Sequence, residues 1–176
     1  MQKRWFGVVG LCLPVGLFLL LTGCAHPPRV PAPPALIESR ISAYGLTVTV
    51  ESTPREVTAL LLRGLDNGDG DLLARLAAVE DIMAELERIY RRYGKDSKLT
   101  REQVVQVAVS GWLAAYAAFE RGATGISGER VEGKEATVYC LGRSLHAGQR
   151  RRLEVELVRE NGWWKTRLGL RDSPAD

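Results

Sequence analysis

The sequence predicts an α+β fold, with three helices packed on one face of a curved antiparallel sheet of about four strands. Between Val57 and Phe119, apolar residues recur at helical spacing in three segments, as expected for helices that bury one side. From Ile126 onward, apolar and polar residues alternate, which is typical of strands with one buried face. One helical layer on one sheet face buries both kinds of apolar surface.

The N-terminus has the pattern of a secretory signal. Lys3 and Arg4 precede an apolar run over residues 5–21, which ends in small residues before Cys24. The segment Leu21-Thr22-Gly23-Cys24 resembles the lipobox of bacterial lipoproteins. In that family the cysteine thiol receives a diacylglyceryl group, and the chain is cut just before it. The resemblance implies that residues 1–23 are a signal peptide and that Cys24 is the lipidated (for example palmitate-bearing) N-terminus.

An uncleaved transmembrane helix is the alternative interpretation, because about 18 apolar residues are near the minimum for a span. Pro14, Gly16 and the proline-rich segment that follows favour cleavage. Two or more acyl chains anchor a protein stably, so we expect the mature chain to be held on a membrane without crossing it. Ala25 stands where the family's inner-membrane retention signal has Asp. This implies a place on the periplasmic face of the outer membrane.

Charge and composition argue against a nucleic-acid partner. The formal net charge is +3, and without Lys3 and Arg4 it is near +1 (3 − 2). Near-neutral chains rarely bind nucleic acids. The basic run Arg150–Arg152 fits a solvated hairpin end or a contact with a phosphate or lipid headgroup, and we favour the hairpin end.

The few cysteines and histidines predict neither a disulfide nor a metal or cofactor. Cys12 leaves with the signal and Cys24 is lipidated, so Cys140 remains alone and we expect it to be a small buried apolar residue. Only His26 and His146 occur. Zinc sites and histidine-based triads therefore lack their usual residues.

Domain boundaries follow from composition. Residues 24–43 read as the lipidated N-terminus and a linker that is stiffened by the prolines between His26 and Pro34. Residues 44–172 read as a single α+β domain. Its first element is a short strand at Leu46–Val50, where β-branched residues alternate.

Capping signals set the helix starts. Thr53-Pro54-Arg55-Glu56 and Thr100-Arg101-Glu102-Gln103 are capping boxes that open the first and third helices. A second helix is expected from a cap at Asp71 to Gly94. The acidic turn at residues 66–71 lacks the first and last ligands of a calcium loop, so we interpret it as an interhelix turn. The apolar sides of the second and third helices hold, in order, Leu72, Leu76, Val79, Met83, Leu86, Tyr90, Tyr93, Val104, Val105, Ala108, Trp112, Tyr116 and Phe119.

Asn161-Gly162 is a two-residue hairpin signal of the type I′ class. It predicts that Glu160 faces Trp163, that Arg159 stacks on Trp164, and that Glu156 lies beside Arg167. An earlier strand, near Ile126–Val131, turns back at Gly133. With a loop over residues 144–149, the expected buried pairs are Leu157 with Thr166 and Ala136, Val155 with Leu168 and Val138, and Leu153 with Leu170 and Cys140.

Several of these segments resemble cone-fold domains related to nuclear transport factor two, and more narrowly their small bacterial lipoprotein members. The segments are Thr53–Val57, Leu65–Asp69, Val131–Val138 and Glu154–Lys165. The likeness covers most of Ser52 to Leu170. It implies helices wrapped by a bent sheet, with a pocket between them.

Cone-fold enzymes place an acidic base in that pocket, and no acidic residue falls on the expected apolar faces here. We therefore expect no enzyme. The favoured hypothesis is an interaction or assembly module whose outer sheet face, with Trp163, Val158 and Leu141, contacts a second copy or another envelope protein. The alternative is a small apolar or lipid-like ligand in the cone pocket, which would be lined by Trp112, Tyr116 and Tyr139.

Overall fold

The computed structural model describes residues 39–94, 98–145 and 148–175. The expected signal peptide, Cys24 and the proline-rich linker up to residue 38 lie outside the described residues. None of the helices in the described part is both long and apolar enough to cross a membrane.

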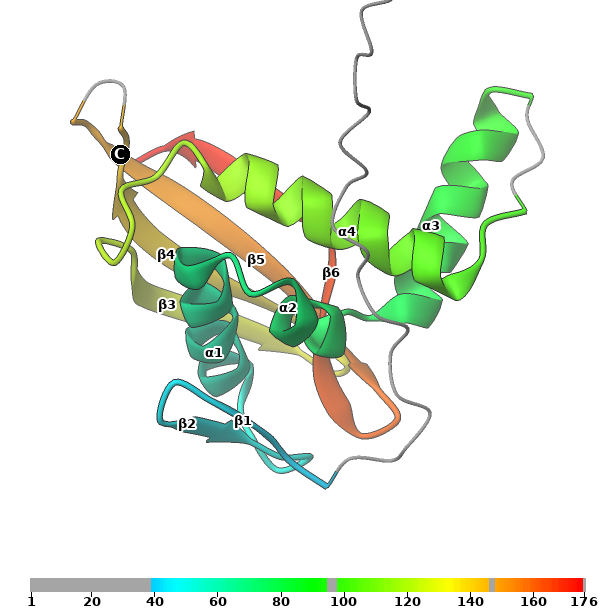
Figure 1. Cartoon of the computed structure of the whole chain (residues 1–176), viewed down its shortest axis with the longest axis horizontal. Coiled ribbons are helices and arrows are strands. Elements are labelled where there is room, and N and C mark those ends of the chain that lie inside the picture. The colour runs from blue at the N-terminus through cyan, green and yellow to red at the C-terminus, as the bar shows by residue number, and fades with distance from the viewer. Residues whose placement is uncertain (1–38, 95–97, 146–147, 176) are drawn as a thin grey trace, which may run out of the picture.

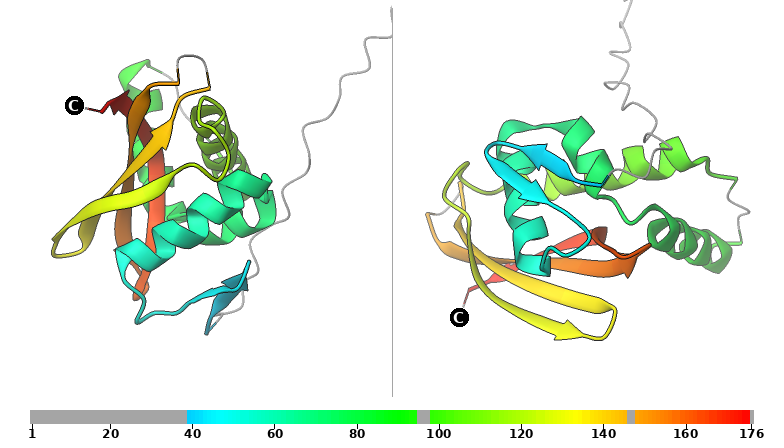
Figure 2. Two further views of the ribbon diagram at one scale, coloured as in Figure 1. Left: turned by 90° about the vertical axis from the view of Figure 1, so that its left-hand side faces the viewer. Right: turned by 90° about the horizontal axis from the view of Figure 1, so that it is seen from below.

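The described chain has an α+β fold with a four-stranded antiparallel sheet in the order β3-β4-β5-β6, as expected (Figure 1). Helices α1, α2 and α4 lie on one side of this twisted sheet (Figure 2, left), and α3 lies next to its edge strand β6 (Figure 1). A small β1-β2 hairpin packs against α1. The elements are β1 (Ile41–Ala43), β2 (Leu46–Val48), α1 (Pro54–Asn67), α2 (Gly70–Leu76), α3 (Val79–Arg92), α4 (Arg101–Tyr116), β3 (Gly125–Glu132), β4 (Glu135–Arg143), β5 (Arg150–Glu160) and β6 (Trp163–Pro174).

Both predicted capping boxes are confirmed. The Glu56 N–H donates to Thr53 Oγ1 at 3.3 Å, and the Thr53 N–H donates to the Glu56 carboxylate at 2.7 Å. Thr100 and Gln103 make the same reciprocal pair at the start of α4, at 3.3 and 2.9 Å. Each box satisfies backbone donors that have no partner within the helix.

The expected single second helix is wrong, because the chain breaks into α2 and α3 at Ala77 and Ala78. Ala77 has an extended backbone, Ala78 is not helical, and the Ala78 N–H donates to the Thr166 carbonyl of β6 at 2.9 Å. Alanine favours helix, so pairing with the sheet edge outweighs the local preference. The described helices therefore number four, not three. The helix α2 is capped by Asp69, whose carboxylate accepts the Leu72 N–H at 3.0 Å, and not by Asp71.

The β5–β6 hairpin follows the expected register only next to its turn. Asn161 and Gly162 both have positive φ, Glu160 pairs with Trp163, and Leu157 pairs with Thr166. Beyond Leu157 a bulge in β6 shifts the pairing. Val155 therefore faces Leu170 rather than Leu168, and Leu153 faces Asp172 rather than Leu170. The β4–β5 register agrees with the expected one throughout.

The β6 bulge is fixed by a buried tryptophan from the helical layer. The Trp112 indole N–H lies 3.0 Å from the carbonyl oxygens of both Arg167 and Leu168. These carbonyls sit in the shifted segment, so the indole supplies a donor that the sheet does not. Trp112 is fully buried between α4 and the sheet.

The core lies between the helices and the inner face of β4, β5 and β6. Val138, Cys140, Leu153, Val155 and Leu157 are fully buried there. Burial raises the pKa of the Cys140 thiol to about 12, so this cysteine is an unreactive apolar residue, as expected.

Gly142 is closely surrounded by other side chains, and Gly142→Ala is expected to lower the free energy of unfolding by about 1–3 kcal/mol. A Cβ at this position would lie 2.6 Å from the Phe119 ring and 2.6 Å from Thr124 Oγ1. Urea denaturation of the two proteins measures the change. Gly125→Ala is the matched strand control, because its Cβ would meet nothing within 4 Å. Equal losses for both variants would contradict this account of the packing.

Candidate interaction surface

The outer face of the sheet does not present the expected apolar anchor. Trp163 is only 8 % exposed, although the sequence placed it on an open face. The Lys165 ammonium lies 5.3 Å from the centre of its ring, and the same ammonium donates to the Arg75 carbonyl. Lys165 is thus held across the indole. Val158 and Leu141 are half-buried on the same sheet face.

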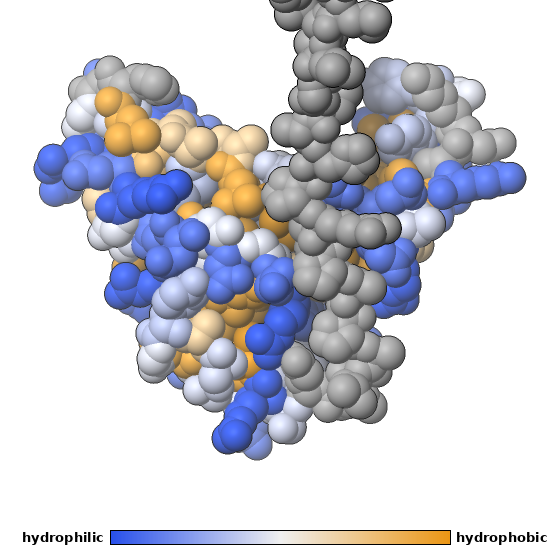
Figure 3. Space-filling model, viewed as in Figure 1, coloured by the Kyte–Doolittle hydropathy of each residue, from blue (hydrophilic) through white to orange (hydrophobic). Residues whose placement is uncertain are grey.

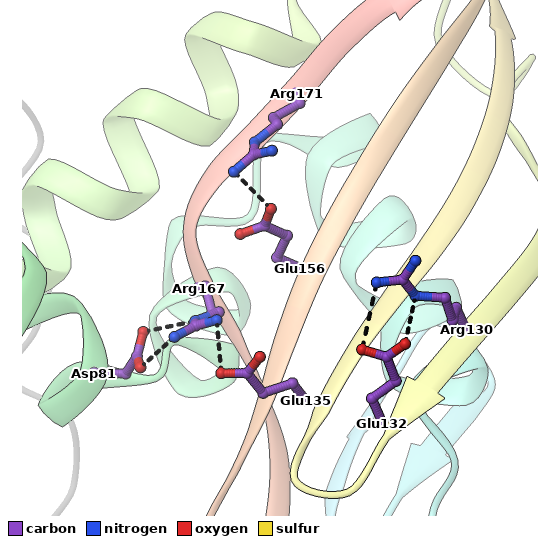
Figure 4. Close-up of polar contacts among 7 residues, drawn as sticks. All are labelled: Asp81, Arg130, Glu132, Glu135, Glu156, Arg167 and Arg171. Atoms are coloured by element: carbon purple, nitrogen blue, oxygen red, sulfur yellow. Dashed lines mark hydrogen bonds and ion pairs between the residues drawn. The ribbon is translucent and has the colours of Figure 1, made fainter.

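Several charged side chains on the outer sheet face form ion pairs with each other or with Asp81 of α3 (Figure 4). Arg167 donates to both carboxylate oxygens of Asp81 at 2.9 Å, and these bonds raise the pKa of its guanidinium. The expected Arg167–Glu156 pair does not form, because the β6 bulge moves Arg171 next to Glu156, at 2.9 Å. The other pairs are Arg167 with Glu135 and Arg130 with Glu132. Such a face is well solvated and gives little net energy on association.

The three expected pocket residues do not line one cavity. Trp112 is buried and bonded to β6. Tyr116 is 4 % exposed, and its hydroxyl donates to Asp66 at 2.7 Å. Burial, with that hydrogen bond, raises the pKa of Tyr116 above its ordinary range, so the phenol stays protonated. Tyr139 points to the opposite sheet face, where its ring lies beside Gly128.

Asp66 has a structural role that the sequence did not reveal. Besides Tyr116, its carboxylate accepts the Gly122 N–H at 2.8 Å. It therefore ties the end of α1 to the loop that follows α4. The neighbouring Asp69 caps α2 and also accepts the Tyr44 hydroxyl at 2.9 Å. In the acidic turn at residues 66–71, the carboxylates of Asp66 and Asp69 thus cap a helix and hydrogen-bond to neighbouring segments, in keeping with an interhelix turn.

No candidate metal centre occurs in the part of the chain that the structure describes. It contains no group of three or more His, Cys, Asp or Glu residues placed to hold a metal ion. A pocket of about 410 Å³ lies between α1 and the start of β3. Both acidic residues that line it already accept hydrogen bonds. The Glu56 carboxylate accepts the Thr53 N–H, and the Asp66 carboxylate accepts the Tyr116 hydroxyl.

Helix α4 has an outward side that is both exposed and uncharged. No charged residue occurs from Gln103 to Phe119. A helix that is apolar all round is normally covered on every side, yet Val107 is 44 % exposed. We define the α4 face as the exposed residues Val107, Ser110, Gly111, Ala114 and Ala117.

An apolar groove adjoins the C-terminal end of the α4 face. It has a volume of about 690 Å³. Most of its lining is apolar, with Leu65 of α1, Leu113 and Ala117 of α4, and Leu145 of the β4–β5 connection, and the charged residues Glu120 and Arg121 also line it. Leu145 is 59 % exposed, and the space-filling view shows apolar surface over this end of α4 (Figure 3). The groove and the α4 face together form one apolar area that is not covered by the described residues.

Comparisons with known proteins give no guide to function. No protein-family model matches the chain, and no curated protein is similar to it in sequence. A SEC-C motif containing protein from Rhodopseudomonas palustris is similar in structure, with 14 % identity and a TM-score of 0.42 over 70 % of this chain and 80 % of that one.

Two further solved structures are similar at the same level. A DUF4783 family protein from Bacteroides uniformis has 9 % identity and a TM-score of 0.43 over 71 % of this chain and 99 % of its own. A proposed NTF2-like transpeptidase from Campylobacter jejuni has 15 % identity and a TM-score of 0.42 over 66 % and 100 %. Likeness at these scores does not establish a shared fold or activity.

Proposed function

We propose that the protein is a lipid-anchored lipoprotein of the cell envelope, and that its domain is a non-catalytic contact module. Its contact surface is the α4 face with the adjoining groove, rather than the outer sheet face. The observation that carries this proposal is an uncharged, exposed helix side that ends at an apolar groove of about 690 Å³. Exposed apolar area of this kind marks sites of association.

The polar character of the sheet supports this choice of surface. The core of a protein interface is depleted in charged residues, and the outer sheet face carries the ion pairs of Arg167, Arg171 and Arg130. The five residues of the α4 face carry no charge, and the charged residues of the proposed surface are Glu120 and Arg121 at the groove. The flat row of small side chains on the α4 face also allows close approach of a partner backbone.

The alternative of a small apolar or lipid-like ligand in the cone has less support. Trp112 and Tyr116 fill the space between helices and sheet and are bonded there. Tyr139 lies on the other side of the sheet. The domain interior therefore offers no cavity formed by these three residues.

The anchor places the contact surface at a membrane. Two or more acyl chains on Cys24 would hold the protein there, and Ala25 supports the outer membrane as its location. The expected linker over residues 24–43 is too long at its C-terminal end, because Ile41–Ala43 form β1 and Ile41 is buried in the core. The proline-rich part before β1 then spaces the domain from the lipid surface.

Ala114→Glu in the full-length, lipidated chain is expected to reduce the size of the particle that mild detergent extracts from the envelope. The substitution puts an uncompensated charge at the centre of the proposed interface. Sedimentation of the extracted protein measures this change, and the thermal unfolding midpoint should stay the same, because Ala114 is exposed. Ala84→Glu, at an exposed position of α3, is the matched control. A particle that Ala114→Glu leaves unchanged, or that Ala84→Glu reduces equally, would contradict the proposal.

A further inference from the structure

We infer that a phosphate group binds between Arg143 and Arg150, in a hollow at the end of the sheet where β4 leads into β5. The phosphate is either free in solution or part of a lipid headgroup, since both offer the same kind of oxygen acceptor to the two guanidinium groups. This site goes beyond the proposed function and does not depend on what covers the α4 face. The strand register, the hollow and the charges that line it point to the site.

The strand register places two arginines directly opposite each other. Arg143 of β4 pairs with Arg150 of β5 in the antiparallel ladder, so the two side chains leave the same face of the sheet. The Cβ atoms of such a pair lie about 5 Å apart, and like charges in this position destabilise a sheet. An anion held between the two guanidinium groups replaces that repulsion with two attractive contacts.

A hollow beside the two arginines gives the anion a place to bind. It has a volume of about 610 Å³, and both Arg143 and Arg150 line it. Gly125 of β3 lines it as well and pairs with Leu141 of β4. Because glycine has no side chain, β3 leaves this part of the face open, and a Cβ placed on Gly125 would meet nothing within 4 Å. The hollow therefore has room for a phosphate together with part of the molecule that carries it.

The charges that line the hollow favour an anion. They are the positive charges of Arg143 and Arg150 and the negative charge of Glu120. The Glu120 N–H donates to the Arg143 carbonyl at 2.8 Å, which fixes the backbone at this point. Their side chains approach only to 3.8 Å and are 48 % and 66 % exposed, so this ion pair is weak. Arg150 is exposed and makes no ion pair within the described residues.

The chemistry of the two side chains selects phosphate. A guanidinium group is planar and always charged, and it can donate two parallel N–H bonds to the oxygens of one phosphate. Two such groups on opposite sides of the hollow can hold one phosphate from both sides. Phosphate-bearing headgroups would also be close at hand for a domain that is anchored by acyl chains.

The first test uses isothermal titration calorimetry with inorganic phosphate at constant ionic strength. The purified chain begins at Ala25 and keeps every core residue that the structure describes, since the first of these is Ile41. One phosphate should bind per chain. Arg143→Gln and Arg150→Gln should each weaken binding about tenfold or more, because each removes a charged hydrogen-bond donor.

Two further variants make the calorimetry specific to the hollow. Glu120→Gln should bind phosphate more tightly than the unaltered chain, because it removes the carboxylate that competes for Arg143. A loss of fold cannot produce such a gain. Arg88→Gln removes one positive charge at an exposed position of α3, and it should leave the affinity for phosphate unchanged.

Vesicles distinguish the two sources of the phosphate group. The same chain, which has no acyl anchor, is sedimented with vesicles of phosphatidylglycerol and phosphatidylcholine in equal parts. Binding that Arg150→Gln weakens and Arg88→Gln does not would support a lipid headgroup. Saturable binding of inorganic phosphate without binding to vesicles would support a soluble phosphate compound. Binding of neither probe would overturn the inference, as would binding that Arg88→Gln weakens as much as Arg150→Gln does.

Discussion

Trp112→Ala is expected to lower the free energy of unfolding by about 3–5 kcal/mol, which is a large part of the 5–15 kcal/mol typical of a domain. Trp112 is fully buried. Its removal leaves a cavity between α4 and the sheet, and it also takes the indole donor from the carbonyls of Arg167 and Leu168. Chemical denaturation followed by circular dichroism measures the loss.

Trp112→Phe separates the two contributions. It keeps most of the ring volume but removes the N–H group, so the two bulge carbonyls lose their donor. An unsatisfied buried group costs about 1–3 kcal/mol, so this variant should be intermediate in stability. A Trp112→Phe protein as stable as the unaltered one would show that the indole does not hold the bulge.

Cys24→Ser is expected to abolish both lipidation and removal of the signal peptide. The lipobox resemblance ties cleavage to the modified cysteine thiol, and serine has none. In cells fed labelled palmitate, the unaltered protein should take up label and begin at residue 24. The variant should stay unlabelled and keep residues 1–23, as intact-mass measurement would show.

Cys12→Ser is the matched control for lipidation, because it changes a cysteine of the same N-terminal segment but leaves Leu21–Cys24 intact. It should be labelled and cleaved like the unaltered protein. Label on the Cys24→Ser variant, or loss of label from the Cys12→Ser variant, would contradict the assignment of the anchor.

Local signals in the sequence predicted the elements that depend on local interactions. The Thr53 and Thr100 capping boxes and the Asn161-Gly162 turn each involve a few adjacent residues, and the structure has all three. The β4–β5 register also followed from alternation, since one buried face determines which residues point inward.

The features that the sequence missed depend on contacts between distant segments. The break at Ala77 and Ala78 arises from pairing with Thr166 of β6, and the β6 bulge is held by Trp112 of α4. No alternation or helix pattern in either segment carries that information.

The sequence contains an indication of the candidate surface that an analysis of apolar periodicity alone overlooks. The apolar stripe of the third helix identified its buried side, but the absence of charge on every side from Gln103 to Phe119 was equally visible. By contrast, the burial of Trp163 depends on Lys165 being held at the Arg75 carbonyl. That contact joins β6 to α2 and is not encoded locally.

The most direct test of the contact surface is site-specific photocrosslinking of the full-length, lipidated chain in intact envelopes. A photoreactive residue replaces either Val107 on the α4 face or Glu154 on the outer sheet face, which is half-buried opposite Tyr139. The account predicts a crosslinked product from position 107 and none from position 154. A product from position 154 alone would contradict it and return the contact to the sheet.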